Sequence, residues 1–206
     1  MSVSESSAES AREMSQEPAP DKGPPKNVVT GLIKAMRPRQ WVKNLLVLIA
    51  PVAAYGSDVK VDDPRQLAIR IAIAFVAFSL AASSVYLVND SRDVEADRAH
   101  PTKRFRPVAA GVVPEWLAYT VAAVLGIAAL AVALLATPNL AVVIAVYIAM
   151  QMGYCFGLKH QPVLDICIVA SAYLIRAIAG GAATGIPLSG WFLLGIAFGS
   201  LFMAAG

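Results

Sequence analysis

Long apolar stretches set the strongest limit on how this chain can fold. Six segments approach the roughly 20 apolar residues that a helix needs to cross a membrane, and they cover residues 41–55, 67–88, 116–136, 140–158, 163–184 and 188–206. Hydrophobic residues make up 57% of the 206 residues and charged residues 15%, against about 45–50% and about 25% in soluble domains. Because lipid cannot hydrogen-bond to an open backbone, we predict an all-α, polytopic transmembrane helical bundle.

The basic residues between these segments indicate how the bundle is oriented. Lys and Arg gather in the cytoplasmic loops of membrane proteins, and in this chain they occupy every second connection. They precede the first segment and follow the second and the fourth: Lys34, Arg37, Arg39 and Lys43, then Arg92, Arg98, Lys103, Arg104 and Arg106, then Lys159. We therefore expect a multi-pass protein of the cell (plasma) membrane with its amino terminus on the cytoplasmic side.

The two ends of the chain differ from its middle. Residues 1–30 are rich in Ser, Glu, Pro and Ala and cannot bury enough apolar surface to fold. We predict a disordered cytoplasmic tail over 1–30 and a transmembrane domain over 31–206. The last apolar segment runs to Gly206 without a flanking charge, which favours a truncated chain over a six-helix protein. The formal net charge of +3 is too small to indicate nucleic-acid binding.

Acidic residues gather where the second apolar segment ends. If the helix continues there, Asn89, Asp93 and Asp97 share one face at i, i+4 and i+8, and Asp90 borders it. Carboxylates at this spacing repel one another, and a bound cation removes that repulsion. Mg²⁺ suits such oxygen ligands, because proteins usually hold it by one or two carboxylates together with substrate phosphates. We predict that these residues bind Mg²⁺; the alternative is a solvated loop with weak surface ion pairs.

A basic run follows the acidic stretch. Lys103, Arg104 and Arg106 come shortly after Asp97. Arg offers a planar fork that matches phosphate, and Lys a compact point charge. A metal on one side and these cations on the other predict a phosphate pocket at the membrane surface. We expect other cytoplasmic cations to contribute to it, namely Lys34, Arg39, Lys43 and Lys159.

The fifth segment contains further candidates. Arg176 falls deep within it, where a charge is costly; it either serves the site or pairs with an acid on another helix. Asp165, near the start of the same segment, either belongs to the site or is a first-turn acid that the helix dipole favours. The Gly180-Gly181 pair is more typical of close helix packing than of ligand contact.

Together these residues resemble the first signature of the UbiA superfamily of intramembrane transferases. The pattern N-D-x-x-D-x-x-x-D followed by R-P-x-x-x-G falls on Asn89, Asp90, Asp93, Asp97, Arg106, Pro107 and Gly111. Residues 36–44 (MRPRQWVKN), 154–166 (YCFGLKHQPVLDI) and 171–181 (SAYLIRAIAGG) are similar to the decaprenyl-phosphate phosphoribosyltransferase branch. The resemblance covers about residues 34–206, and it implies about nine helices in a complete member, of which about six are present here.

The resemblance implies a reaction and a role for each residue. The branch uses Mg²⁺ to transfer 5-phosphoribose from phosphoribosyl diphosphate to decaprenyl (polyprenyl) phosphate, releasing diphosphate and supplying a lipid-linked precursor of cell-wall arabinan in actinobacteria. The catalytic residues that it implies are Asp90, Asp93, Asp97, Lys159 and Asp165. The substrate-binding residues that it implies are Lys34, Arg39, Lys43, Asn89, Lys103, Arg106, Tyr154 and Arg176.

Two other functions stay open on the sequence. The first is a UbiA-type prenyltransferase that uses an isoprenyl diphosphate and an aromatic acceptor. The second is a transporter or channel, which we favour least because transporters place their polar sites near the bilayer midplane and these acids gather at one end. The sequence leaves the acceptor chain length and the formation of a homo-oligomer open.

Overall fold

The computed structural model describes residues 23–55, 63–157 and 162–205, and within those ranges it is helical without a strand. This confirms the all-α prediction. The helices are α2 (Val28–Ala35), the 3₁₀ helix η1 (Pro38–Leu48), α3 (Ile49–Tyr55), α4 (Pro64–Arg92), α5 (Val94–Ala99), the short 3₁₀ helix η2 (Lys103–Phe105), α6 (Glu115–Ala136), α7 (Pro138–Phe156), α8 (Pro162–Thr184) and α9 (Gly190–Ala205).

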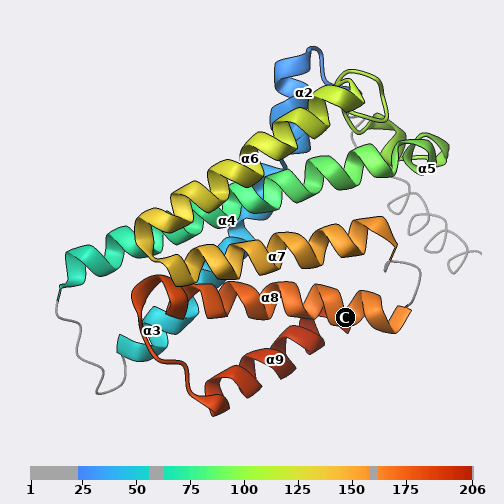
Figure 1. The fold of residues 1–206 in the computed structure, drawn as a ribbon. Coiled ribbons are helices and arrows are strands. Elements are labelled where there is room, and N and C mark those ends of the chain that lie inside the picture. The colour runs from blue at the N-terminus through green and yellow to red at the C-terminus, as the bar shows by residue number, and fades with distance from the viewer. Residues whose placement is uncertain (1–22, 56–62, 158–161, 206) are drawn as a thin grey trace, which may run out of the picture.

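The long helices pack in two layers. Figure 1 shows α4 and α6 lying side by side, α7 and α8 forming the next layer, and α9 folding back under α8. The α6–α7 connection turns at Thr137, whose hydroxyl accepts from the Leu140 amide at 3.0 Å and donates to the Ala182 carbonyl of α8 at 2.7 Å. One side chain therefore caps α7 and fixes it to α8.

Four of the six predicted spans are long, apolar helices in the described part of the chain: α4, α6, α7 and residues Ile166–Thr184 of α8. The outer faces of α6 and α7 expose large apolar side chains, as lipid-facing helices do: Ile127, Leu134, Leu135, Val142 and Val146. α9 is apolar as well and runs from Gly190 to Ala205, the last described residue. The amino-terminal end also differs, because α2 begins within the segment expected to be a tail, where Asn27 and Thr30 form a capping box.

The first predicted span is not a single α-helix, which corrects the expectation for residues 41–55. It consists of the 3₁₀ helix η1 followed by the seven residues of α3. Asn44, Val47 and Ala50 are buried while Val42, Leu45 and Leu48 are exposed, so burial repeats every three residues, as in a 3₁₀ helix. At about 2.0 Å per 3₁₀ residue and about 1.5 Å per α residue, the two helices together are long enough for the roughly 30 Å of a bilayer core.

Small residues on both sides make room for η1. The Asn44 amide donates to the Ser79 hydroxyl of α4 at 3.1 Å, and the Trp41 indole N–H donates to Ser83 Oγ at 3.1 Å. On the other side, a Cβ on Gly180 of α8 would lie 2.1 Å from the Val47 carbonyl oxygen. The prediction that this glycine serves close packing is confirmed, since a side chain at position 180 would collide with the backbone of η1.

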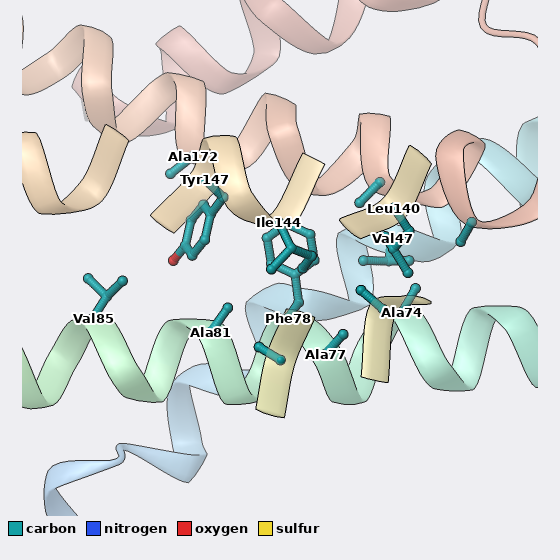
Figure 2. Close-up of a cluster of buried hydrophobic side chains, with 14 of the residues drawn as sticks. Val47, Ala74, Ala77, Phe78, Ala81, Val85, Leu140, Ile144, Tyr147 and Ala172 are labelled. Carbon is teal, nitrogen blue, oxygen red and sulfur yellow. The ribbon is translucent and has the colours of Figure 1, made fainter. Parts of the chain in front are cut away.

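Alanines and aromatic rings form the core between α4 and α7. Ala74, Ala77 and Ala81 of α4 are fully buried, and their spacing places them on one helical face. Figure 2 shows Tyr147 of α7 and Phe78 of α4 filling the space between the two helices, with ring centroids 5.1 Å apart and ring planes tilted by 57°. Within lipid, such close van der Waals packing stabilises a helix pair where the hydrophobic effect does not.

Candidate active site

The predicted acidic stripe is built from two helices rather than one. α4 ends at Arg92, and Asp93 leaves the helical conformation with φ −97° and ψ 10° before α5 begins at Val94. The Asp93 amide still donates to the Asn89 carbonyl at 3.0 Å, and the Asp97 amide to the Asp93 carbonyl at 2.7 Å. The four-residue spacing of the stripe therefore survives the change of helix at Asp93.

Two of the acids form a ladder of ion pairs with two arginines. Arg37 Nη2 lies 2.5 Å from Asp90 Oδ1, while Arg106 Nη1 lies 3.4 Å from the same oxygen and 2.7 Å from Asp97 Oδ2. The carboxylate side chains are only 1% and 4% exposed, whereas the arginine side chains are 26% and 27% exposed. The buried carboxylates thus hold the two guanidinium groups in place at the edge of the site.

The loop after the basic run positions Arg106. Arg98 Nε of α5 donates to the Ala109 carbonyl at 3.1 Å, and the Val113 amide donates to the Pro107 carbonyl at 3.0 Å. Gly111 turns the loop with a positive φ of 74°, a conformation that favours glycine. The R-P-x-x-x-G part of the pattern is therefore a tight turn that carries Arg106 back to α4 and α5.

A cavity of about 380 Å³ lies beside this ladder. Of the residues predicted from the sequence, it is lined by Asn89, Asp93, Lys103, Arg106 and Tyr154. Oxygen ligands from Asn89 and Asp93 thus share one pocket with Lys and Arg side chains. The acidic stretch and the basic run therefore meet in one pocket.

Sequence reasoning missed several residues of this pocket: Arg37, Val85, Tyr86, Gln151 and Cys155. Arg37 is the most informative, because it is the one non-glycine residue in the described ranges with a positive φ, at 53°. Its guanidinium also lies over the Tyr86 ring, 4.7 Å from the centroid. The available signal was the MRPRQWVKN segment, which contains Arg37 beside Pro38.

The other predicted site residues lie away from this pocket or outside the described residues. Lys34 and Arg39 line a second cavity, and exposed Lys43 lies over the Tyr173 ring at 5.5 Å. Asp165 lies in the first turn of α8, but its side chain is outside the described part, as is all of Lys159. The roles predicted for these residues stay predictions.

Arg176 is buried among neutral groups. Its guanidinium donates to Asn44 Oδ1 at 2.9 Å, to the Ala172 carbonyl at 2.6 Å and to the Tyr147 hydroxyl at 3.3 Å. None of the ion pairs among the described residues includes it, nor does it line the pocket that contains Asp93. In the described chain, Arg176 joins η1, α7 and α8.

The donor set of the pocket fits a magnesium ion that is also held by substrate. No group of three or more His, Cys, Asp or Glu residues within the described ranges is arranged to hold a metal by itself. Asn89 and Asp93 line the cavity; Asp90 and Asp97 form ion pairs with arginines. Two protein oxygen donors match the usual Mg²⁺ site, in which substrate phosphates and water complete the coordination.

These features define an α-helical, multi-pass membrane protein with an acid- and base-lined pocket at one end of its helices. The chain belongs to the UbiA prenyltransferase family, whose sequence pattern matches residues 45–206. This confirms the family resemblance.

Two relatives named decaprenyl-phosphate phosphoribosyltransferase come from actinobacteria. The chain is 67% identical over 196 residues to that of Mycolicibacterium smegmatis, covering 95% of this chain and 61% of the relative. It is 70% identical over 183 residues to that of Mycobacterium tuberculosis, covering 89% of this chain and 60% of the relative. The chain therefore spans about 60% of the length of these relatives.

A solved structure confirms the fold independently of sequence. A UbiA homologue from Archaeoglobus fulgidus, determined with GPP and Mg²⁺ bound, superposes with a TM-score of 0.72 at 18% identity. The match covers 84% of this chain and 60% of that chain. At this identity the likeness establishes the shared helical architecture.

Proposed function

We propose that the protein transfers 5-phosphoribose from phosphoribosyl diphosphate to decaprenyl or another polyprenyl phosphate, with release of diphosphate. The observation that carries the diphosphate-binding part of this proposal is the pocket that Asn89 and Asp93 share with Lys103 and Arg106. Relatives with 67% and 70% identity bear the name of this activity, which supports these substrates over others that contain a diphosphate. The proposal also places the pocket end of the bundle at the cytoplasmic face, where the soluble donor is.

The arrangement accounts for how the donor diphosphate would be held. Asn89 and Asp93 are the residues that would hold Mg²⁺, and the bound ion would neutralise charge on the diphosphate oxygens. Arg106 offers a planar fork for phosphate and Lys103 a point charge. Because Asp97 and Asp90 already fix Arg106, this cation is preorganised for the charge that develops as diphosphate leaves.

The reaction needs no strong general base within this pocket. The bond between ribose C1 and the diphosphate oxygen breaks as a bond forms between C1 and an oxygen of the lipid phosphate. That oxygen is already anionic, so no proton has to be removed before it attacks. The residues have to place two phosphate-bearing substrates together and keep their repulsion low. Arg37, Lys103 and Arg106 in the pocket lining are suited to this.

The decisive experiment offers two substrate pairs to membranes that contain the protein and Mg²⁺. One pair is phosphoribosyl diphosphate with decaprenyl phosphate, and the other is an isoprenyl diphosphate with an aromatic acid. We expect a phosphoribosylated lipid from the first pair and no prenylated product from the second. An Asp93→Ala variant that is still inserted should make neither product; wild-type turnover in this variant would refute the role of Asp93.

A second candidate function is prenyl transfer to an aromatic acceptor. It is favoured by one observation, the structural likeness to a homologue that binds GPP and Mg²⁺. Both reactions present a diphosphate to the pocket, so the lining residues alone do not separate them. The much higher identity to the phosphoribosyltransferases places this candidate second.

A further inference from the structure

The segment before the first span forms a helix with two different faces. Gly31 and Ala35 of α2 are buried, and a Cβ on Gly31 would lie 2.8 Å from the Val113 side chain. On the outside, Val29 and Ile33 are 67% and 54% exposed. A short helix with an exposed apolar face and neighbouring cations is typical of the membrane interface.

A second cavity, of about 640 Å³, opens where α2 meets η1. Among the described residues, its lining combines apolar Ile33 and Pro38 with three cations, Lys34, Arg37 and Arg39, and none of these lining residues is an acid. A cavity with apolar walls and several positive charges is complementary to an anionic head group that carries an apolar chain.

Arg37 lines both this cavity and the pocket that contains Asp93. Its hydrogen bond to Asp90 uses Nη2, and a guanidinium has further N–H donors in the same plane. The left-handed backbone at Arg37 and the Tyr86 ring beneath its guanidinium hold this group at the boundary. A phosphate in either cavity therefore lies next to the same arginine.

We propose that the cavity between α2 and η1 binds the phosphate head of the polyprenyl phosphate acceptor, and that Arg37 lines both the acceptor site and the donor site. The proposal rests on the proposed function and deepens it. From the sequence, Lys34 and Arg39 were predicted to bind substrate phosphate without a distinction between donor and acceptor. Because they line a separate cavity, we assign them to the acceptor. The exposed apolar face of α2, beside Ile33, gives the polyprenyl chain a path into the lipid.

The test measures binding of each substrate separately, without turnover. Protein purified in detergent is titrated with radiolabelled decaprenyl phosphate, and in a second experiment with phosphoribosyl diphosphate and Mg²⁺. In the double variant Lys34→Gln/Arg39→Gln we expect affinity for decaprenyl phosphate to fall at least about tenfold, because two charge-assisted contacts are lost. Affinity for phosphoribosyl diphosphate should change less than about twofold, because its pocket is intact.

Matched variants separate site binding from general effects of charge. Lys26→Gln removes one exposed cation just before α2 from outside the cavity lining, and should leave both affinities unchanged. Exchanging the cations, in Lys34→Arg/Arg39→Lys, should restore lipid binding. Phosphatidylglycerol and inorganic phosphate should displace decaprenyl phosphate only weakly.

Several results would overturn the assignment. In the double glutamine variant, these are a loss of donor affinity as large as the loss of lipid affinity, or no loss of either. In the controls, they are a loss of lipid affinity in Lys26→Gln as large as that in the double variant, or competition by phosphatidylglycerol as strong as that by unlabelled decaprenyl phosphate. The proposed function fails on a different result, the absence of phosphoribosyl transfer by wild-type protein. Selective loss of lipid binding in the double variant would support the cavity even then.

Discussion

The Arg37 guanidinium donates to the Asp90 carboxylate at 2.5 Å across 53 residues of sequence. This contact joins the turn between α2 and η1 to the carboxyl end of α4. Asp90 is almost completely buried, so its charge depends on the arginines around it. Arg37 in turn adopts a left-handed conformation, which costs about 1–3 kcal/mol and persists only where surrounding contacts impose it. Each residue therefore accounts for the unusual environment of the other.

Replacing Arg37 should destabilise the protein through Asp90. Breaking a buried ion pair costs about 3–5 kcal/mol when the remaining charge has no partner. Because Arg37 is partly exposed and Arg106 stays near Asp90, we expect Arg37→Met to cost about 2 kcal/mol. Thermal unfolding in detergent measures the loss. Adding Asp90→Asn should recover part of the stability, since the stranded charge is removed; strictly additive losses would contradict the coupling.

Gly180→Ala should separate η1 from α8. The added methyl group would lie 2.1 Å from the Val47 carbonyl oxygen, and overpacking of this kind costs about 1–3 kcal/mol. Gly199→Ala in α9 is the matched control, because its Cβ would meet no atom within 4 Å and alanine favours a helix over glycine. Unfolding temperatures of both variants test this, and equal stability of the two would argue against the close contact.

The charge of Arg176 makes Asn44 difficult to replace with an apolar residue. Asn44 accepts from Arg176 Nε and donates to Ser79, so Asn44→Leu leaves a buried guanidinium with one acceptor fewer. We expect a loss of about 1–3 kcal/mol. Asn44→Asp keeps an acceptor and adds an opposite charge, so it should be the more stable of the two variants. The reverse order in a denaturant titration would show that Arg176 does not depend on Asn44.

Asp97 and Arg106 should affect donor binding together. Asp97→Asn leaves the pocket lining unchanged but weakens the 2.7 Å contact that orients Arg106. We expect KM for phosphoribosyl diphosphate to rise about tenfold in Asp97→Asn and at least as much in Arg106→Lys, which loses the planar fork. Combining the two substitutions should add little, since both act through one guanidinium. Fully additive changes in KM would contradict this.

The sequence predicted the parts of the fold that depend on local pattern. The apolar runs ending near Ala136 and Thr184 became α6 and α8 with bounds close to those expected, because a span must be long and apolar whatever packs beside it. The spacing of Asn89, Asp93 and Asp97 was also predictable from local pattern, because hydrogen bonds between backbone groups four residues apart maintain it.

Features that depend on a distant partner were not predictable from local pattern. The 3₁₀ form of η1 reflects the narrow space between α4 and α8, which Ser79 and Gly180 create from other parts of the chain. The role of Arg37 needs Asp90, which is far away in sequence. The loop that turns at Gly111 returns Arg106 to Asp90 and Asp97, and a one-dimensional spacing does not contain that information.

The 3₁₀ form of η1 also sets how far this segment extends along the bundle, and therefore where Arg37 lies. Rewinding its eleven residues into an α-helix would shorten it by about 5 Å and rotate Asn44 and Val47 out of line with each other. Arg37, at the head of this extended segment, would then be drawn away from Asp90. The hydrogen bond of Asn44 and the packing of Val47 hold η1 in its longer 3₁₀ form. These contacts thereby keep Arg37 within reach of Asp90.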